Sequence, residues 1–463
     1  MKSVTKRLAL SALAISLASP YAASANNGYF LIGYGAKSRG MGGVGIAYGV
    51  DGLAAGANPA SMIQVDPGRF DIGGELFFPD RAVSHQGDTI GTFKEESDGH
   101  VFLLPSMGGI QKLSKDFAWG VAVVGAGLGT SYNQQSRTTC PTTTDTYFFN
   151  ISCGATEQVG VSLMQMQILP SAAFRVSEHD TIGVSVALAA QVFRAYGLES
   201  FVDLGFSSSN EALTNRGPDW SYGLGWRLGW LGQYMDNKLS LGVNYNARVN
   251  MSEFNRYAGL FAQGGDFDIP ENFGVGMAFK VTDHTDVAFD VTRIKYSDVP
   301  SVGNPGPNAF DATDFNPLCP GVDGPECKLG GALGLGFGWR DQTVYKLGVN
   351  HKLNERHTLR AGWNHAKAPV PADQVLFNFL APGVIEDTLT LGYTYVTNKD
   401  WLTSYFNGSQ GEITLTYNHG FKNTVKGQTT FYTGGAGAPP DGSTNAAISL
   451  VIDTLGISYG IKF

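Results

Sequence analysis

The chain has 463 residues, with 32 lysines and arginines against 40 aspartates and glutamates and a formal net charge of −8. This acidic balance argues against nucleic acid as a partner, because a phosphate backbone is bound by clustered positive charge. Its 61 glycines and 28 phenylalanines are unusual for a soluble enzyme but suit strands closed into a barrel.

The first 25 residues have the pattern of a secretory signal peptide. Basic residues at positions 2, 6 and 7 precede an apolar stretch from Leu8 to about Leu17, and Ala23-Ser24-Ala25 supplies a cleavage site. The apolar stretch is about half the length of a membrane-spanning helix, so an uncleaved anchor is the weaker alternative. We expect the mature chain to begin at Asn26 with a formal charge of −11, because three positive charges leave with residues 1–25.

Residues 26–66 show little alternation of apolar and polar residues and are rich in small ones. They cannot form another barrel strand, and the segment from Gly40 to Ala60 is too apolar to hang free in the periplasm. The sequence therefore predicts a hatch, or plug, folded into a barrel lumen. We assign residues 67–463 to the barrel.

The rest of the chain contains long segments in which apolar and polar residues alternate, as between Leu239 and Asn250. A soluble β-sandwich would alternate too. Many segments run ten residues or more, however, which is the length that tilted strands need to cross a bilayer. No apolar run after the signal approaches 18 residues, which excludes a helical membrane protein.

We count fourteen such segments, an even number as bacterial barrels require. They lie near 69–78, 99–112, 117–130, 162–176, 181–194, 219–233, 237–252, 270–282, 285–297, 340–353, 356–366, 386–397, 410–420 and 449–463. The fold class is therefore all-β, a fourteen-stranded antiparallel transmembrane barrel with a small hatch inside. Long and short connections alternate, and long loops belong outside the cell. The turn around 398–409 is the one moderately long periplasmic connection.

Both pairs of cysteines fall in predicted external loops, Cys140 with Cys153 and Cys319 with Cys327. An even count in an exported chain indicates disulfides, and of the three possible pairings we expect the local one. Each bond would then staple a loop that has no core of its own. Neither pair has the C-x-x-C spacing of a zinc site and no nearby histidine completes one, so we expect no metal.

The last predicted strand places Leu455, Ile457, Tyr459 and Ile461 on one face and ends on Phe463. An aromatic terminus on an outward, alternating strand resembles the signal read by the barrel-insertion machinery of the outer membrane. We therefore expect that machinery to be a partner during assembly.

A series of motifs runs along the mature chain. They are Gly28-Tyr29-Phe30, Gly33 to Gly43, Asn58-Pro59-Ala60, Leu169-Pro170-Ser171, Ile269-Pro270-Glu271, Asp341 with Tyr345 to Gly348, Arg360-Ala361-Gly362 and Pro369-Val370-Pro371. In this order they resemble the FadL-type transporters of the Gram-negative outer membrane, which take up long-chain fatty acids or aromatic hydrocarbons. The resemblance covers essentially the whole mature chain. It implies a monomeric fourteen-stranded barrel with a hatch, surrounded by outer-membrane lipid and lipopolysaccharide, that releases hydrophobic molecules sideways into the membrane.

The resemblance also suggests residues along the route. Phe30 is a candidate pocket residue, and Asn58, Pro59 and Ala60 look like the family motif in the hatch, the natural gate. Asn before Pro is also a common start of a plain turn, so both interpretations stay open.

A carboxylate ligand would need a cation to meet it. Lys346 points inward by the alternation of its strand, and Arg194 lies at the outer end of its strand, near where the family places a ligand-contacting cation. The position of Arg194 in the alternation gives the lipid side unless it lies above the bilayer. For both residues the alternative is a solvated rim or lumen charge.

The third predicted strand contains Gly125, Gly127 and Gly129. Glycine inside a strand marks a bulge, a bend or a close approach. In the family an inward kink of this strand opens the lateral exit, so these glycines are candidates for that kink. Glycine is common throughout this chain, so chance could also place three here.

Two patterns typical of enzymes lack the context that they need. Gly40 to Gly45 fits G-x-G-x-x-G without a preceding strand, and Gly456 to Gly460 fits G-x-S-x-G without a following helix. We expect no enzyme and no cofactor. A general porin and an outer-membrane lipid hydrolase remain as alternatives, although a hydrolase needs a serine, a histidine and an orienting group together.

The residues do not decide between a fatty acid and an aromatic or other hydrocarbon, and we place the fatty acid first. Specificity is expected to lie in the loops at 195–218, 253–269 and 298–339.

Overall fold

The computed structural model describes residues 27–86, 93–133, 158–203, 205–306, 316–320, 324–397, 400–427 and 445–463. The expected signal peptide and the predicted pair Cys140 and Cys153 lie outside these ranges.

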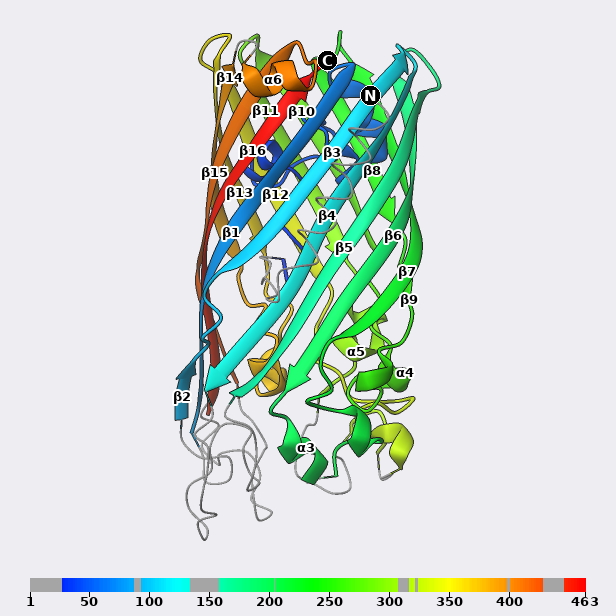
Figure 1. The fold of residues 1–463 in the computed structure, drawn as a ribbon, viewed down its shortest axis with the longest axis vertical. Helices are drawn as coiled ribbons and strands as arrows, with labels where there is room; N and C mark the ends of the chain where they lie inside the picture. Colours follow the sequence, from blue (N-terminus) through cyan, green and yellow to red (C-terminus); the bar gives the residue numbers. More distant parts are fainter. Residues whose placement is uncertain are drawn as a thin grey trace.

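Fourteen long antiparallel strands form a closed barrel (Figure 1). The strands are β1 (Gly68–His85), β3 (Phe102–Ser114), β4 (Phe117–Asn133), β5 (Gln158–Arg175), β6 (Asp180–Tyr196), β7 (Asp219–Tyr234), β8 (Leu239–Asn246), β10 (Asn272–Thr282), β11 (Thr285–Ile294), β12 (Gln342–Lys352), β13 (His357–Ala366), β14 (Asp387–Thr397), β15 (Gln410–Gly427) and β16 (Ala446–Lys462). Each pairs with the next along the chain, and β1 pairs with β16 to close the ring. Two short strands, β2 (Phe93–Glu96) and β9 (Asn250–Met251), pair with the outer parts of β1 and β7. The predicted barrel and its fourteen strands are confirmed.

Alternation along the strands separates a lipid-facing surface from a lumen. In β6, for example, Ile182, Val184, Val186 and Leu188 are exposed on the outside, whereas the residues between them are buried. This arrangement suits a bilayer, because exposed apolar side chains on the outer face meet acyl chains rather than water. None of the helices in the described ranges is long and apolar enough to span a membrane.

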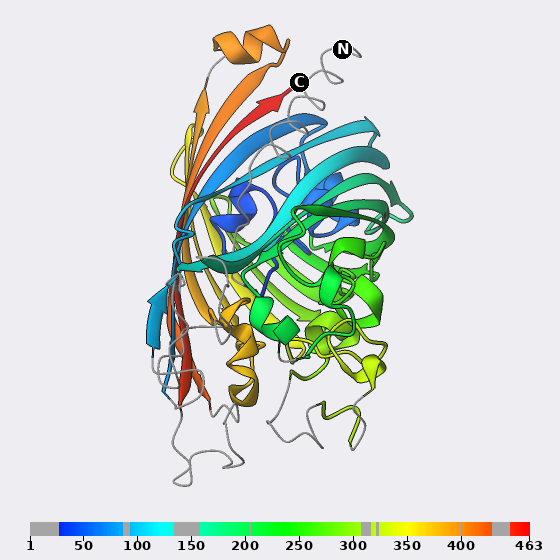
Figure 2. The ribbon, with the colours of Figure 1, turned by 60° about the horizontal axis from the view of Figure 1, so that its bottom comes forward.

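The hatch occupies the lumen, as predicted (Figure 2). It contains α2 (Ala36–Arg39), η1 (Ala54–Gly56) and η2 (Pro59–Gln64), and nearly all of its residues are buried. Wall glycines make room for it: a Cβ added at Gly183 would lie 2.1 Å from Ala60 N, and one added at Gly362 would lie 2.1 Å from Gly42 N. Part of the high glycine content is therefore explained by close approach of wall and hatch.

The two ends of the barrel differ. The end at the top of Figure 1 carries the C-terminus and α6 (Trp401–Tyr405), and its turns are short. Asp400 caps α6 by accepting a hydrogen bond from Thr403 N (2.7 Å), and the phenol of Tyr459 donates to the same carboxylate. This is the moderately long turn expected on the periplasmic side.

The opposite end carries the long loops. Their short helices are α3 (Glu199–Asp203), η3 (Asn210–Ala212), η4 (Asn255–Tyr257), α4 (Ala262–Gly265), η5 (Tyr296–Asp298), α5 (Pro300–Gly303), η6 (Pro325–Cys327), η7 (Ala372–Gln374) and η8 (Phe377–Phe379).

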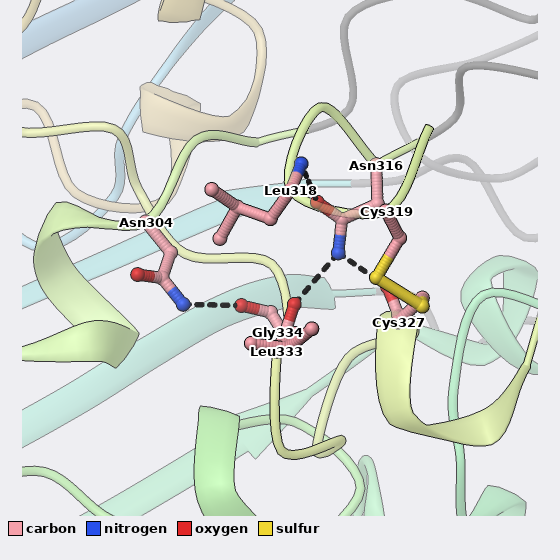
Figure 3. Close-up of a disulfide and its surroundings, with 7 residues drawn as sticks. All are labelled: Asn304, Asn316, Leu318, Cys319, Cys327, Leu333 and Gly334. Carbon is pink, nitrogen blue, oxygen red and sulfur yellow. Dashed lines mark hydrogen bonds between the residues drawn. A yellow bond between two sulfur atoms is a disulfide. The ribbon is translucent and has the colours of Figure 1, made fainter. Parts of the chain in front are cut away.

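One of the two predicted disulfides is present, between Cys319 and Cys327 (Figure 3). The amide of Asn316 donates to Cys327 O and to Leu333 O, both at 2.7 Å, so a buried polar side chain supports the bonded turn. The expected local pairing is confirmed for these two cysteines.

Candidate functional site

The hydrogen-bonded ladder between β3 and β4 stops partway along the wall. The last pair is Met107 with Val123, whereas β4 remains paired with β5 along its whole length. Hydrogen bonds to β4 resume beyond the break, where Asp98 N donates to Ser131 O (2.7 Å). We call the interrupted part of the wall the β3–β4 window, bordered by residues 102–106 and 124–130.

The local sequence explains the break. Pro105 has no N–H to donate to a neighbouring strand. Gly125, Gly127 and Gly129 alternate along β4 with Val124, Ala126 and Leu128, which are buried towards the lumen. Gly125 is partly exposed, whereas Gly127 and Gly129 are buried. A Cβ added at Gly125 would lie 3.6 Å from Gln165 O and 4.0 Å from Pro105 O, which are ordinary van der Waals contacts, so a side chain can be placed there without a clash at its first atom.

The outer half of β4 is hydrogen-bonded to a segment that lies inside the lumen. Thr130 Oγ1 donates to Leu380 O (3.0 Å) and Tyr132 OH donates to Phe379 O (2.8 Å). Both acceptors belong to the connection between β13 and β14, which packs into the apolar core of the outer half. Sequence analysis missed this contact, because an apolar connection between two strands does not reveal that it folds inward.

The motif Asn58-Pro59-Ala60 joins the hatch to the wall. Asn58 Oδ1 accepts from Ala60 N (3.0 Å) and caps η2, while Nδ2 donates to Ile46 O (2.7 Å) and Trp230 O (3.0 Å). Pro59 takes the first helical position, where its missing N–H is harmless. The motif is thus a buried helix start that also holds the wall.

A buried ionic cluster fixes the other side of the hatch. Glu412 on β15 accepts from Lys37 of the hatch (2.5 Å), from Arg69 on β1 (2.7 Å) and from Lys462 on β16 (3.0 Å). A second ion pair joins Arg39 to Glu75. No sequence pattern pointed to these residues, because their partners are up to 375 positions away.

Phe30 and Lys346 line the same small cavity, of about 40 Å³, between hatch and wall. Lys346 points inward, as predicted, and Nζ donates to Gly43 O (3.3 Å). Directly opposite it on β11, Asp290 accepts hydrogen bonds from two hatch amides, Gly45 N (2.7 Å) and Ile46 N (3.0 Å). Both wall charges therefore contact the hatch.

An aromatic cluster surrounds the start of the hatch. Tyr29 stacks on Phe30 with ring centroids 5.3 Å apart, and Tyr296 and Trp339 contact Tyr29 at 5.4 and 5.9 Å. The phenol of Tyr296 donates to Asn27 O (2.6 Å). Sequence reasoning singled out Phe30 alone. Tyr29 is its neighbour in the chain, whereas Tyr296 and Trp339 come from distant outer loops.

Arg194 does not join this cavity. It is exposed on the outer face of β6, where its guanidinium lies 4.9 Å from the ring centroid of Tyr196. The alternation of β6 directs it away from the lumen, so the structure does not bring the two predicted cations together.

The family model described as "Outer membrane protein transport protein (OMPP1/FadL/TodX)" matches residues 26–428. The chain belongs to this family. Members of the FadL/TodX family are outer-membrane transport channels for hydrophobic molecules rather than enzymes. The chain is accordingly a protein of the Gram-negative outer membrane.

Solved structures of similar architecture include the toluene transporter TodX of Pseudomonas putida, with a TM-score of 0.63 and 20% identity over 94% of this chain and 99% of that chain. A FadL homologue of Pseudomonas aeruginosa has a TM-score of 0.64 and 14% identity over 94% and 100% of the two chains. The toluene transporter TbuX of Ralstonia pickettii has a TM-score of 0.58 and 17% identity over 93% and 99%. At such identities the likeness concerns the fold alone. None of the curated proteins matches the chain.

Proposed function

We propose that this FadL/TodX-type channel takes up long-chain fatty acids passively. A ligand is captured at an extracellular cleft, enters the lumen, and leaves sideways into the outer membrane after the hatch rearranges. The observation that carries the proposal is the β3–β4 window, because an interrupted ladder is a place where an apolar molecule can cross the wall. The proposal includes a monomeric channel that contacts lipopolysaccharide and is assembled by the barrel-insertion machinery.

The filled lumen supports a lateral rather than an axial route. Hatch residues are buried against the wall on several sides. Asn58 of the hatch donates to a wall carbonyl, and the wall residues Asp290 and Glu412 accept hydrogen bonds from the hatch. Sideways release also keeps an apolar ligand out of water, which favours the membrane as its destination.

The size of the cavity supports a movement of the hatch. Pockets for small molecules usually measure about 300–1,000 Å³, whereas Phe30 and Lys346 line only about 40 Å³. A fatty acid cannot enter that space unless the hatch withdraws. Gly43 would then release Lys346, and the ammonium group would become available to a carboxylate.

Aromatic hydrocarbons are the second candidate. The buried rings of Tyr29, Phe30, Tyr296 and Trp339 offer an apolar surface without a charge, which suits a ligand with no polar group. The likeness to structures titled toluene transporters agrees with this alternative.

Uptake of radiolabelled oleate and of toluene decides between the candidates. Cells that lack other hydrophobic-uptake barrels would carry the wild-type chain, the Gly125→Phe/Gly127→Phe variant or no chain. Neither glycine has a positive φ, so the added rings cause no backbone strain, and they should obstruct the window. We expect oleate uptake to need the wild-type chain and to fall several-fold in the variant.

Val123→Phe is the matched control, since Val123 lies on the same face of β4 but within the intact ladder. It should transport as the wild type does. If cells without the wild-type chain lose toluene uptake but not oleate uptake, the substrate is an aromatic hydrocarbon and not a fatty acid. Normal uptake by the double glycine variant would refute lateral release, and equal uptake with and without the chain would refute transport itself.

A further inference from the structure

Arg81 is a buried cation with most of its donors unused. It lies on β1, and its side chain points into the outer half of the lumen with a relative exposure of 1%. Nη2 donates to Gly99 O (2.5 Å), and the guanidinium lies 5.3 Å from the ring centroid of Phe102. Among the residues that the structure describes, Nε and Nη1 have no hydrogen-bond partner. Three of the five N–H groups of this guanidinium are therefore unpaired.

Arg81 also forms no ion pair with a carboxylate among the described residues; the neighbouring Asp80 lies on the opposite, outer face of β1. Several other buried cations have acidic partners, as Arg69 has in Asp71 and Glu412. Arg360 instead donates to Thr394 Oγ1 (2.6 Å), and of its buried nitrogens only Nε is without a hydrogen-bond partner among the described residues. Arg227 has no carboxylate partner either, but its two terminal nitrogens donate to Gly56 O and to the side chain of Gln167. An arginine does not lose its proton in a protein, so an unpaired buried guanidinium is costly unless something binds it.

The surroundings of Arg81 are mainly apolar. Most of the buried, inward-facing residues of the neighbouring strands are apolar: Val83 on β1, Ile448, Leu450 and Ile452 on β16, and Phe102 and Leu104 on β3. Polar exceptions nearby include His85 on the same face of β1 and the phenol of Tyr132 on β4. Leu450 lies directly opposite Arg81 in the β1–β16 ladder. A single cation within an apolar wall has the polarity pattern that fits a long apolar chain with one acidic end.

Arg81 also lies at the outer edge of the β3–β4 window. Its main-chain oxygen accepts from Ser97 N (2.9 Å), and the next residue, Asp98, bonds to Ser131 on β4 where the window ends. Its guanidinium contacts Gly99 and Phe102, the residue at which β3 begins. A ligand whose acidic group met Arg81 would have its tail beside the opening.

We infer that Arg81 is the binding site for the carboxylate of a long-chain monocarboxylic acid at the window. The inference rests on the proposed lateral release and assigns the acidic ligand class to a residue other than Lys346 and Arg194. The unpaired Nε and Nη1 donate charge-assisted hydrogen bonds to the carboxylate, while the tail lies along the apolar wall of β1, β3 and β16.

Equilibrium binding of oleate and of oleamide to the full chain in phospholipid nanodiscs tests the assignment. Oleamide has the same tail and nearly the same size but no charge. The wild type should bind oleate more tightly than oleamide by at least about tenfold, since only the carboxylate can accept charge-assisted hydrogen bonds from the guanidinium. Arg81→Met should remove that preference by weakening oleate alone, and Arg81→Lys should keep part of it.

Arg194→Met is the matched control, because it removes an exposed arginine at the same end of the barrel and should leave the preference unchanged. If Arg81→Met binds oleate as the wild type does, or loses oleate and oleamide equally, the assignment is wrong and Arg81 has a structural or hydrated role. Equal binding of both ligands by the wild type overturns it without any variant. Transport is judged separately: cells that take up no oleate while Arg81 still discriminates in nanodiscs would refute the proposed function and not this site.

Discussion

Asn58 shows at the scale of single residues how the hatch is held. Its side chain is fully buried and makes three hydrogen bonds, one to the amide of Ala60 and two to the carbonyls of Ile46 and Trp230. Only the last of these reaches the wall, where Gly229 leaves the space that the amide needs. One short side chain therefore links a helix start, a hatch turn and a barrel strand.

Asn58→Ala should loosen the hatch locally. Buried hydrogen bonds contribute about 0.5–1.5 kcal/mol each, and unsatisfied partners add to the loss, so we expect at least about 2 kcal/mol of local stability to disappear. This corresponds to roughly thirtyfold faster hydrogen exchange at Ala60 and Ser61. Asn58→Ser keeps a cap but loses both carbonyl contacts, so it should be intermediate. Unchanged exchange in both variants would mean that the motif is a plain turn.

Individual positions were predictable where alternation alone decides them. Lys346 is inward and Arg194 outward for this reason. The carbonyl of Gly43 beside Lys346, and the unpaired donors of Arg81, depend on how distant segments meet. No periodicity encodes such meetings, so the candidate site was only partly visible in the sequence.

At the scale of elements, the strands were predictable because one face must be apolar towards lipid. Their ends were less so: β1 continues to His85, although the predicted segment stopped at residue 78. Beyond Phe77, β1 still pairs with β16, but on its other side β3 gives way to the segment that reaches Ser97. Pairing with β16, the last strand in the chain, therefore continues β1 past Pro79 and Asp80, two residue types that strands disfavour.

The outer loop that carries α4 should respond to pH. Burial, together with the neighbouring carboxylate of Asp268, raises the pKa of Asp266 to about 7. A raised pKa means that the folded loop binds a proton more tightly than the unfolded chain, so stability is lost as pH rises from about 4 to about 7. Hydrogen exchange across residues 253–269, corrected for its intrinsic pH dependence, should be faster at pH 8 than at pH 5.

Asp266→Asn should abolish that pH dependence, because the amide cannot be charged and still fits the site. Asp283→Asn, at an exposed turn at the opposite end of the barrel, is the control and should leave it intact. If the loop exchanges equally at both pH values in the wild type, the carboxylate pair does not govern it.

In the molecule as a whole, the hatch fills the lumen of the barrel, and this distinguishes it from a general porin. A porin keeps an aqueous channel through its barrel, whereas here glycines of several strands accept the hatch and a buried ionic cluster anchors it. The fourteen-stranded wall followed from the sequence. The fit between hatch and wall did not, because each contact joins residues that are far apart in the chain.

The wild-type chain in a planar lipid bilayer should therefore show little steady ion conductance. Glu412→Gln tests the reason: it leaves Lys37 and Arg69 buried with one partner fewer, and breaking a buried ion pair commonly costs about 3–5 kcal/mol. Transient hatch openings should then appear as conductance events that the wild type lacks. Asp453→Asn, which removes a partly exposed carboxylate beside His419 on the outer face, should show no conductance events. Steady conductance of porin size in the wild type would mean that the hatch does not seal the barrel, and axial passage would have to replace release through the β3–β4 window.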